Sequence, residues 1–143
     1  WGASNFSALA NSLLQRYGGS CFLLGGKSEH VMADGISQEL GKPSSLISVI
    51  QMPLQDVIAL LAEAQLFFGN DTGMLNLSAA CGTHSIGLFG HPISAWVANS
   101  SPRIHPIYPD AGLSNEGVSQ IEPSRVIQAL NQLELLHELE IGA

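Results

Sequence analysis

Short apolar segments and amphipathic segments alternate along this chain of 143 residues, and that alternation restricts the possible folds more than any other feature. Apolar runs bounded by Gly, Pro or Ser predict strands, and apolar residues spaced three or four apart predict the helices between them. Strands that alternate with helices at this spacing form a parallel sheet with right-handed crossovers. We therefore expect an α/β fold with a doubly wound parallel sheet. The predicted strands are residues 21–24, 46–50, 65–69, 85–89 and 103–107.

The predicted helices follow from the same apolar spacing and from residues that favour helix ends. Ser28 is expected to cap one helix, and Pro53 and Pro123 each begin another. The length suits a single domain over residues 1–143, with a tail at 136–143 that we expect to fray. The predicted helices are residues 6–17, 28–40, 53–62, 74–80 and 123–136, and residues 107–117 are predicted to form a loop.

The composition argues against several classes of function. The net charge is −7 and the five Lys and Arg residues are scattered, so we expect no nucleic-acid partner. Because no apolar run reaches transmembrane length, we expect no direct membrane insertion. Cys21 and Cys81 are expected to be two buried, reduced thiols of a cytosolic protein. The five histidines lack metal-ligand spacing, so we predict no metal site.

The segment 66–82 has the strongest functional pattern, because an apolar strand runs into Gly-Asn-Asp-Thr-Gly and then into a helix of small residues. The N–H groups of Gly73 and Met74 are expected to point outward at the positive end of that helix, where anions bind. Thr72 can donate its hydroxyl, and Asp71 can accept hydrogen bonds from sugar hydroxyls. These residues predict a phosphate-bearing ligand such as a sugar nucleotide. The alternative is an ordinary turn with Asp71 or Thr72 as a helix cap.

A second turn, Gly25-Gly26-Lys27-Ser28-Glu29, follows another predicted strand, and we expect both turns to line one cleft. Lys27 could offset phosphate charge, and Glu29 could bind a ribose diol. The alternative is a loop and a capped helix in which Glu29 favours the helix dipole. Met52 is either part of the core or a wall of the cleft, and His91 either reaches the cleft or lies on a surface loop. The sequence contains neither a GxGxxG dinucleotide motif nor a Walker motif.

Taken together, these elements resemble the carboxyl-terminal half of the family 9 glycosyltransferases, the ADP-heptose:lipopolysaccharide heptosyltransferase group. The match runs over residues 1 to about 92, and its Asp-Thr-Gly turn is fairly specific. The segments that match, in chain order, are Trp1 to Phe6, Leu24–Glu29, Asn70–Gly73, Ala79–Gly82 and Leu88–Gly90.

The resemblance implies a role for several residues in binding an activated sugar. Thr72 and Gly73 would hold the diphosphate, and Asp71 would contact the donor sugar. Glu29 would take the ribose, and Met52 would lie against the base. The implied binding residues are Glu29, Met52, Asp71, Thr72, Gly73, Met74 and Asn76, with Lys27 and His91 as further candidates. The expected ligand is ADP-heptose or a similar nucleotide-diphosphate sugar, and Asn76, which stands where the family usually has His, argues against heptose as the specific sugar.

The resemblance further implies a Rossmann-like, donor-binding half of a GT-B enzyme, which inverts the anomeric centre of a sugar during bacterial lipopolysaccharide or other surface glycan synthesis. An amino-terminal domain with the acceptor site and the catalytic base would have to precede Trp1. We therefore expect no catalytic residue in this chain, no cofactor, and transfer only with the missing domain or a partner subunit.

The expected location is cytoplasmic, and any attachment to the inner membrane would come through the missing half. Two alternatives remain: a module that binds nucleotide sugars without transferring them, and a purely structural or interaction domain.

Overall fold

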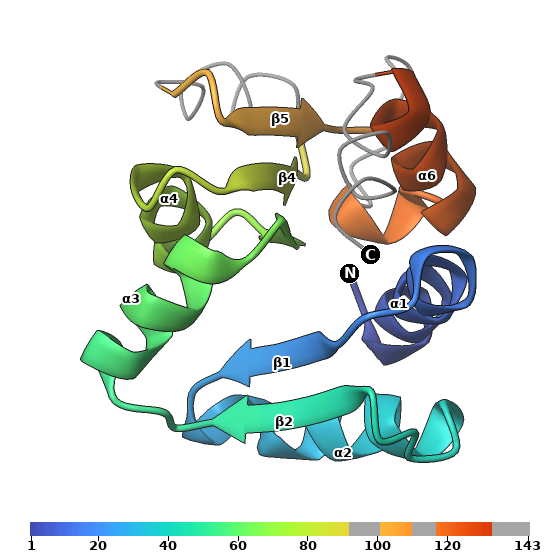
Figure 1. The fold of residues 1–143 in the computed structure, drawn as a ribbon. Coiled ribbons are helices and arrows are strands. Elements are labelled where there is room, and N and C mark those ends of the chain that lie inside the picture. Colours follow the sequence, from blue (N-terminus) through green and yellow to red (C-terminus); the bar gives the residue numbers. More distant parts are fainter. Residues whose placement is uncertain (92–100, 110–116, 133–143) are drawn as a thin grey trace. The chain divides into compact units, whose positions relative to one another are not determined.

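The computed structural model describes residues 1–91, 101–109 and 117–132, and these residues form helices and parallel strands in alternation (Figure 1). The chain divides into two compact units, one of Trp1 with Leu54–Glu122 and one of Gly2–Pro53 with Pro123–Ala143. We call them the β3–β5 unit and the β1–β2 unit, after their strands.

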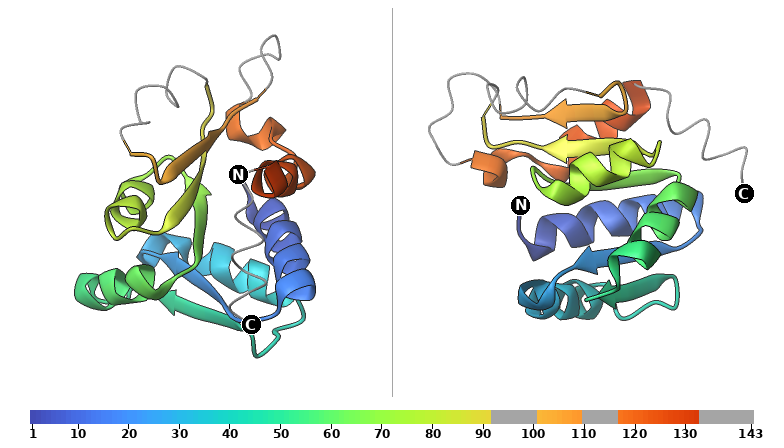
Figure 2. Two further views of the ribbon diagram at one scale, coloured as in Figure 1. Left: turned by 45° about the horizontal axis from the view of Figure 1, so that its top comes forward. Right: turned by 90° about the vertical axis from the view of Figure 1, so that its left-hand side faces the viewer.

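The β3–β5 unit is built on a three-stranded parallel sheet with β4 at its centre. Leu66 of β3 pairs with His84 of β4, and Ser85 of β4 pairs with Ile104 of β5. The α4 helix packs against all three strands and covers one face of this sheet (Figure 2). The elements are α3 (Leu54–Glu63), β3 (Leu66–Asn70), α4 (Gly73–Ala80), β4 (His84–Leu88), β5 (Ile104–Ile107) and the short 3-10 helix η2 (Gly117–Gln120).

The core of the β3–β5 unit lies between α4 and the sheet. Leu75 and Ala79 of α4 form a buried cluster with Phe89 and Ile104, and Phe67 packs against it. Leu75 and Ala79 are four residues apart and therefore lie on one face of α4. The other members of the cluster lie on the strands or directly after them, so the core forms where this face of α4 packs against the sheet.

Trp1 belongs to the β3–β5 unit although the next residue does not. Its indole N–H donates a hydrogen bond to the Ile121 carbonyl over 2.5 Å, and its side chain is buried. Its amino group donates to the Asn70 side-chain oxygen over 3.3 Å. A buried indole needs such a partner for its N–H, so Trp1 is held in one orientation.

The β1–β2 unit contains two parallel strands, in which Cys21 pairs with Leu46 and Gly25 pairs with Ile50. The α2 helix packs against both strands, and α1 packs against α2 and α6. The elements are α1 (Ala3–Tyr17), β1 (Cys21–Gly25), the 3-10 helix η1 (Lys27–Glu29), α2 (His30–Glu39), β2 (Leu46–Ile50) and α6 (Pro123–Gln132). The buried apolar residues of this unit are Leu9, Ala10, Ala33, Ile36, Leu46, Val126 and Leu130.

The structure confirms the parallel α/β class and differs from the predicted elements mainly at their ends. The prediction that Ser28 caps a helix is wrong, because a 3-10 turn precedes α2 and the N-cap residue is Glu29. Both cysteines are half-buried rather than fully buried. Burial raises the pKa of the Cys21 thiol to about 11, which keeps that thiol protonated. Residues 133–136 of the last predicted helix, the tail at 136–143, and residues 110–116 of the predicted loop lie outside the described residues.

Among the helices that the structure describes, none combines the length and the apolar character that a membrane crossing requires.

Candidate functional site

The turn between β3 and α4 contains the residues predicted to bind an anion. β3 ends at Asn70 and α4 begins at Gly73, so Asp71 and Thr72 form the whole connection. The Asp71 N–H donates to the Leu88 carbonyl over 3.2 Å, which ties the turn to the carboxyl end of β4. Both side chains are exposed, so the turn presents a carboxylate and a hydroxyl to solvent at the start of a helix.

Thr72 is the N-cap residue of α4, and its backbone is extended, with φ −142° and ψ 170°. Its hydroxyl makes no capping hydrogen bond within the described structure, although capping is the usual role of a threonine at this position. The N–H groups of the first helical turn have no partner carbonyl within the helix. The N–H groups of Gly73 and Met74 are therefore hydrogen-bond donors at the helix end. The Thr72 hydroxyl and these N–H groups are therefore available to an anion.

Gly73 leaves the approach to this helix end open. A Cβ atom built on Gly73 would meet no atom of the described residues within 4 Å. A glycine in such a place lets a ligand come close to the backbone. Asn76 lies one turn further along α4, is exposed, and donates through its Nδ2 atom to the Thr72 carbonyl over 3.5 Å. The Met74 side chain is half-buried, and the contribution predicted for this residue comes from its backbone N–H group.

In the β1–β2 unit, Glu29 is held in place by the turn that contains it. Its carboxylate accepts one hydrogen bond from the Gly26 N–H over 2.8 Å and another from the Ser28 hydroxyl over 2.6 Å. The Ser28 hydroxyl first, and then the Gly26 N–H, lower the pKa of Glu29 below its ordinary value. The carboxylate is therefore ionised and oriented at neutral pH, although it is exposed.

Gly25 can pack against the Glu29 side chain only because glycine has no side chain of its own. A Cβ atom at Gly25 would lie 2.7 Å from the Glu29 Cβ atom and 3.1 Å from the Ile50 Cδ1 atom. The distance of 2.7 Å is shorter than real Cβ atoms show, so a larger residue at position 25 would displace Glu29.

Gln51 is a residue of this edge that the sequence did not reveal. Its φ is +62°, which is rare for a residue other than glycine, and its N–H donates to the Gly25 carbonyl over 2.9 Å. This bond joins the ends of β1 and β2 and precedes Met52, which is half-buried. Strained backbone of this kind is concentrated at functional sites. No residue pattern near Gln51 signals the conformation in advance.

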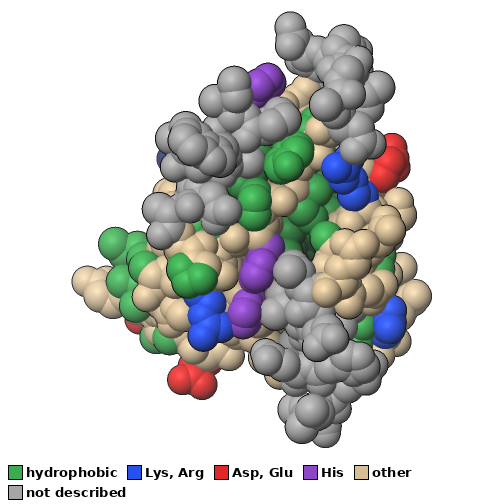
Figure 3. All heavy atoms as spheres, turned by 90° about the horizontal axis from the view of Figure 1, so that it is seen from above, with side chains coloured by type: hydrophobic (Ala, Val, Ile, Leu, Met, Phe, Trp, Pro, Cys, Tyr) green, Lys and Arg blue, Asp and Glu red, His purple; other side chains and the backbone are tan. Residues whose placement is uncertain are grey.

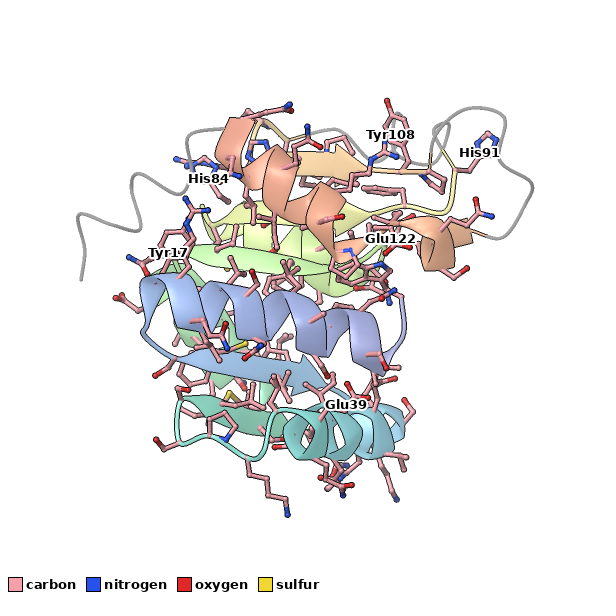
Figure 4. The ribbon with its side chains drawn as sticks, turned by 90° about the vertical axis from the view of Figure 1, so that its right-hand side faces the viewer. Tyr17, Glu39, His84, His91, Tyr108 and Glu122 are labelled. Atoms are coloured by element: carbon pink, nitrogen blue, oxygen red, sulfur yellow. The ribbon has the colours of Figure 1, made fainter. Side chains whose placement is uncertain are left out.

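The structure therefore gathers the predicted residues in two places. The residues that follow β3 are together in the β3–β5 unit, and those that follow β1 and β2 are together in the β1–β2 unit. Lys27 is exposed at the start of η1. His91 is exposed beyond the carboxyl end of β4, and Figure 4 shows it and His84 near opposite ends of the sheet of the β3–β5 unit.

Across residues 1–91, 101–109 and 117–132, no three His, Cys, Asp or Glu side chains gather closely enough to hold a metal ion.

Parallel strands that alternate with helices, with polar turns at the strand carboxyl ends, define an α/β domain of the Rossmann-like type. Comparison with known proteins gives the family. Residues 1–103 match the model of glycosyltransferase family 9 (heptosyltransferase), and the chain belongs to that family.

Solved structures of this family have the same fold. The structure of E. coli ADP-heptose lps heptosyltransferase II aligns with a TM-score of 0.83 and 23% identity, over 96% of this chain and 42% of that one. The crystal structure of the family 9 glycosyltransferase from Veillonella parvula DSM 2008 aligns with a TM-score of 0.78 and 19% identity, over 96% of this chain and 42% of that one. E. coli heptosyltransferase WaaC with ADP aligns with a TM-score of 0.77 and 21% identity, over 92% of this chain and 39% of that one.

These likenesses confirm the expected fold, the Rossmann-like half of a GT-B glycosyltransferase. The chain spans about two fifths of the length of the solved structures, since it covers 39% to 42% of each. Among curated proteins, no sequence matches this chain closely enough to count as a relative.

Proposed function

We propose that this chain is the nucleotide-sugar-binding half of an inverting, heptosyltransferase-like glycosyltransferase that serves bacterial lipopolysaccharide or other surface glycan synthesis. The family match and the names of the similar structures support this, because those proteins are described with ADP-heptose, with ADP and with an ADP-heptose analogue. In the proposal, residues 1–143 act as one binding domain for a nucleotide-diphosphate sugar, in the bacterial cytoplasm.

The observation that carries the proposal is the amino end of α4. Thr72 is an extended N-cap residue whose hydroxyl is not used for capping within the described structure, and the space over Gly73 is open. A helix end built this way has uncommitted donors and a positive partial charge, which suits a diphosphate. We assign the diphosphate to Thr72, Gly73 and the Met74 N–H.

The same donors explain how the chain would assist the reaction. When the sugar leaves a nucleoside diphosphate, negative charge grows on the diphosphate oxygens. Fixed N–H groups and a hydroxyl aimed at those oxygens stabilise this charge without rearranging during the step. Asp71, next to Thr72, carries a charge that would oppose a phosphate, so we assign Asp71 to the hydroxyls of the donor sugar. Asn76, one helical turn away, is assigned to the same sugar.

The remaining donor contacts are assigned to the β1–β2 unit. A carboxylate that is oriented and ionised suits the two hydroxyls of a ribose, so Glu29 is assigned to the ribose. Met52 follows the strained Gln51 and is half-buried, and its thioether is assigned to the face of the base. Lys27 and His91 are further candidates for diphosphate contacts, because both are exposed at strand carboxyl ends.

Transfer to an acceptor also requires a base that removes the acceptor proton, and we propose that this base and the acceptor site belong to an amino-terminal domain or partner subunit. We therefore expect the isolated chain to bind donor without transferring sugar, and any association with the inner membrane to depend on that other part.

Isothermal titration calorimetry tests the proposal directly. We expect ADP and ADP-heptose to bind the purified chain and adenosine to bind much more weakly, because adenosine lacks the diphosphate. UDP-, GDP- and CMP-linked sugars form a panel that reports the preferred base. Failure of every nucleotide diphosphate and nucleotide sugar to bind would favour a purely structural or interaction role instead.

A further inference from the structure

A cluster of three nitrogen-bearing side chains lies at the amino ends of β4 and β5, whereas the proposed donor site lies at the carboxyl end of β4. The Arg103 Nη1 atom lies 2.5 Å from the His84 Nε2 atom, and the His84 Nδ1 atom lies 3.1 Å from the His105 Nε2 atom. The two imidazole rings are stacked, with centroids 5.4 Å apart and planes at 16°. We call Arg103, His84 and His105 the basic cluster.

The hydrogen bonds determine where the protons lie in the basic cluster. A guanidinium can only donate, so His84 must accept through Nε2 and carry its proton on Nδ1. That Nδ1–H then donates to His105, whose Nε2 atom must accept and whose proton must lie on its own Nδ1. With these hydrogen-bond roles both imidazoles are neutral, and Arg103 holds the permanent charge among the three side chains. Adding a proton to either Nε2 atom would remove an acceptor and create a second cation beside the first.

The charge of Arg103 has no acidic partner in the described part of the chain. No described carboxylate lies within 4.0 Å of its guanidinium. The strand and helix that pack beside β4 and β5, namely β3 and α4, contain no Asp, Glu, Lys or Arg. The α3 helix ends at the charged residue Glu63, and its last turn is joined to the residue before β4 by the hydrogen bond from Thr83 to the Leu61 carbonyl.

The basic cluster is accessible on the surface. His84 and His105 are half-buried and Arg103 is exposed. The face of the molecule in Figure 3 shows two histidine side chains side by side with a Lys or Arg side chain next to them. On a chain of net charge −7 with five Lys and Arg residues, such a gathering of nitrogen donors is unusual. It presents to solvent a guanidinium whose side-chain partner is a neutral imidazole rather than an acid.

We propose that Arg103, His84 and His105 form an oxyanion site that binds a phosphate group and takes up protons on the two imidazoles as it does so. A phosphate that replaces the hydrogen bonds among these side chains would accept hydrogen bonds from the guanidinium and from the protonated Nε2 atoms. A guanidinium forms stronger hydrogen bonds to phosphate than to a neutral acceptor. The second pKa of a phosphate ester is about 6, close to that of an imidazole, so phosphate and cluster exchange protons in the same pH range.

This oxyanion site is separate from the proposed donor site in the same unit. His84 begins β4, whereas the Asp71 turn is bonded to Leu88, the last residue of that strand. Four residue steps of about 3.3 Å place the two ends of β4 roughly 13 Å apart. The oxyanion site therefore does not depend on the proposed function, and a failure to bind nucleotides would not affect it.

Histidine NMR tests the site through the protons that it should take up. Long-range proton–nitrogen spectra of the full chain, labelled with nitrogen-15, report the tautomer of each imidazole and its titration midpoint. Without phosphate we expect both cluster histidines as Nδ1–H tautomers. With inorganic phosphate in place of chloride at equal ionic strength, we expect both midpoints to rise by at least about half a pH unit. His30, which is exposed and paired with Asp34 over 3.3 Å, is the internal control and should not respond selectively.

Two variants separate binding from structure. In Arg103→Gln the exposed guanidinium is lost, and we expect the phosphate-dependent rise to disappear while the spectrum otherwise stays that of the folded protein. In Lys42→Gln, a cation elsewhere on the surface is lost and the rise should persist. Equal midpoints in phosphate and chloride, or a rise that survives Arg103→Gln, would overturn the proposal. Comparing inorganic phosphate with a sugar phosphate shows whether the preferred source is the free ion or a phosphorylated glycan.

Discussion

Two threonines of the β3–β5 unit separate binding from stability at the scale of single residues. Thr83 is buried and its hydroxyl donates to the Leu61 carbonyl, whereas the exposed Thr72 hydroxyl has no capping bond within the described structure. We predict that Thr72→Ala weakens ADP binding about tenfold or more, because a hydrogen bond to a charged group contributes about 1.5–3 kcal/mol. Its free energy of unfolding should change by less than about 0.5 kcal/mol.

Thr83→Ala is the matched control for Thr72→Ala. It leaves the buried Leu61 carbonyl without that donor and should lower the free energy of unfolding by about 1–3 kcal/mol. ADP affinity of the folded fraction should stay unchanged. Calorimetric titration and chemical denaturation measure the two quantities, and the reverse pattern would mean that Thr72 is a structural cap.

Gly25 provides a second test at this scale, because its backbone packs directly against the Glu29 side chain. Gly25→Ala places a Cβ atom 2.7 Å from the Glu29 Cβ atom, so the carboxylate must move away from its bonds to Gly26 and Ser28. We predict a loss of ADP affinity of about the same size as that of Glu29→Gln. Titrations of the two variants and of Gly35→Ala, whose Cβ atom would meet its nearest neighbour only at 4.0 Å, check this. Full affinity in Gly25→Ala would show that Glu29 does not contact the ligand.

Residue patterns predicted the positions of the turns better than the hydrogen bonds and backbone angles of the residues in them. The segment from Asp71 to Met74 follows a strand and begins a helix as predicted, because glycine and small residues mark such a junction. Ser28 was predicted to cap a helix but binds Glu29 instead, since the chain enters α2 through a 3-10 turn. Gln51 has a positive φ that depends on its bond to Gly25 across the strands, and no local pattern encodes that.

At the scale of elements, the contact between β4 and α4 leaves no room beside Gly87. A Cβ atom there would lie 2.6 Å from the Phe89 ring and 2.7 Å from Leu75, and both side chains are fully buried. We predict that Gly87→Ala lowers the free energy of unfolding by about 1–3 kcal/mol through overpacking. Gly35→Ala in α2 should instead be neutral or stabilising by up to about 1 kcal/mol, because its Cβ atom has space and alanine favours a helix. Urea denaturation of both variants measures this, and an unchanged Gly87→Ala would show that the contact adapts.

His105, near the start of β5, makes the β3–β5 unit sensitive to acid. Burial first, and then the neighbouring His84 and Arg103, lower the pKa of His105 below its ordinary value of 6.5. The unfolded chain therefore binds a proton at a higher pH than the folded chain does. Stability is fully present above pH 6.5 and falls as the pH drops below 6.5 through the lower folded pKa.

We predict that the melting temperature of the protein falls between about pH 7 and pH 5 in chloride buffer, and that His105→Gln reduces this fall. Differential scanning calorimetry across that range measures it, with His30→Gln as the control at an exposed histidine. A fall of equal size in the wild-type chain and in His105→Gln would exclude His105 as its source.

The positions of strands and helices were predicted from the sequence more accurately than any other feature of this chain. Each predicted strand lies within one or two residues of an observed one, because buried strands of a parallel sheet appear as short apolar runs between turn residues. Pro106 of the 103–107 strand suits an edge position, and β5 does pair with β4 alone within the described sheet. The basic cluster was not predicted, because His84 and His105 are 21 residues apart and meet only through the pairing of β4 with β5. No local spacing in the sequence signals such a contact.

At the scale of the whole molecule, the chain belongs to glycosyltransferase family 9 and has the fold of the heptosyltransferase II structure. The chain covers 42% of the heptosyltransferase II structure, so most of that protein has no counterpart in these residues. We predict that the purified chain transfers no sugar from ADP-heptose to an acceptor on its own, because we propose that the base belongs to an amino-terminal domain or partner subunit. Radiolabelled or mass-spectrometric transfer assays measure this, and turnover by the chain alone would place a catalytic base within it.

The central claim is that the amino end of α4 binds the diphosphate of a nucleotide sugar. Calorimetric titration of ADP into the wild-type chain, Thr72→Ala and Thr83→Ala tests it most directly. We expect ADP to bind the wild-type chain and Thr83→Ala with equal affinity, and to bind Thr72→Ala about tenfold or more weakly. Equal ADP affinity in all three proteins, or no ADP binding to the wild-type chain, would contradict it.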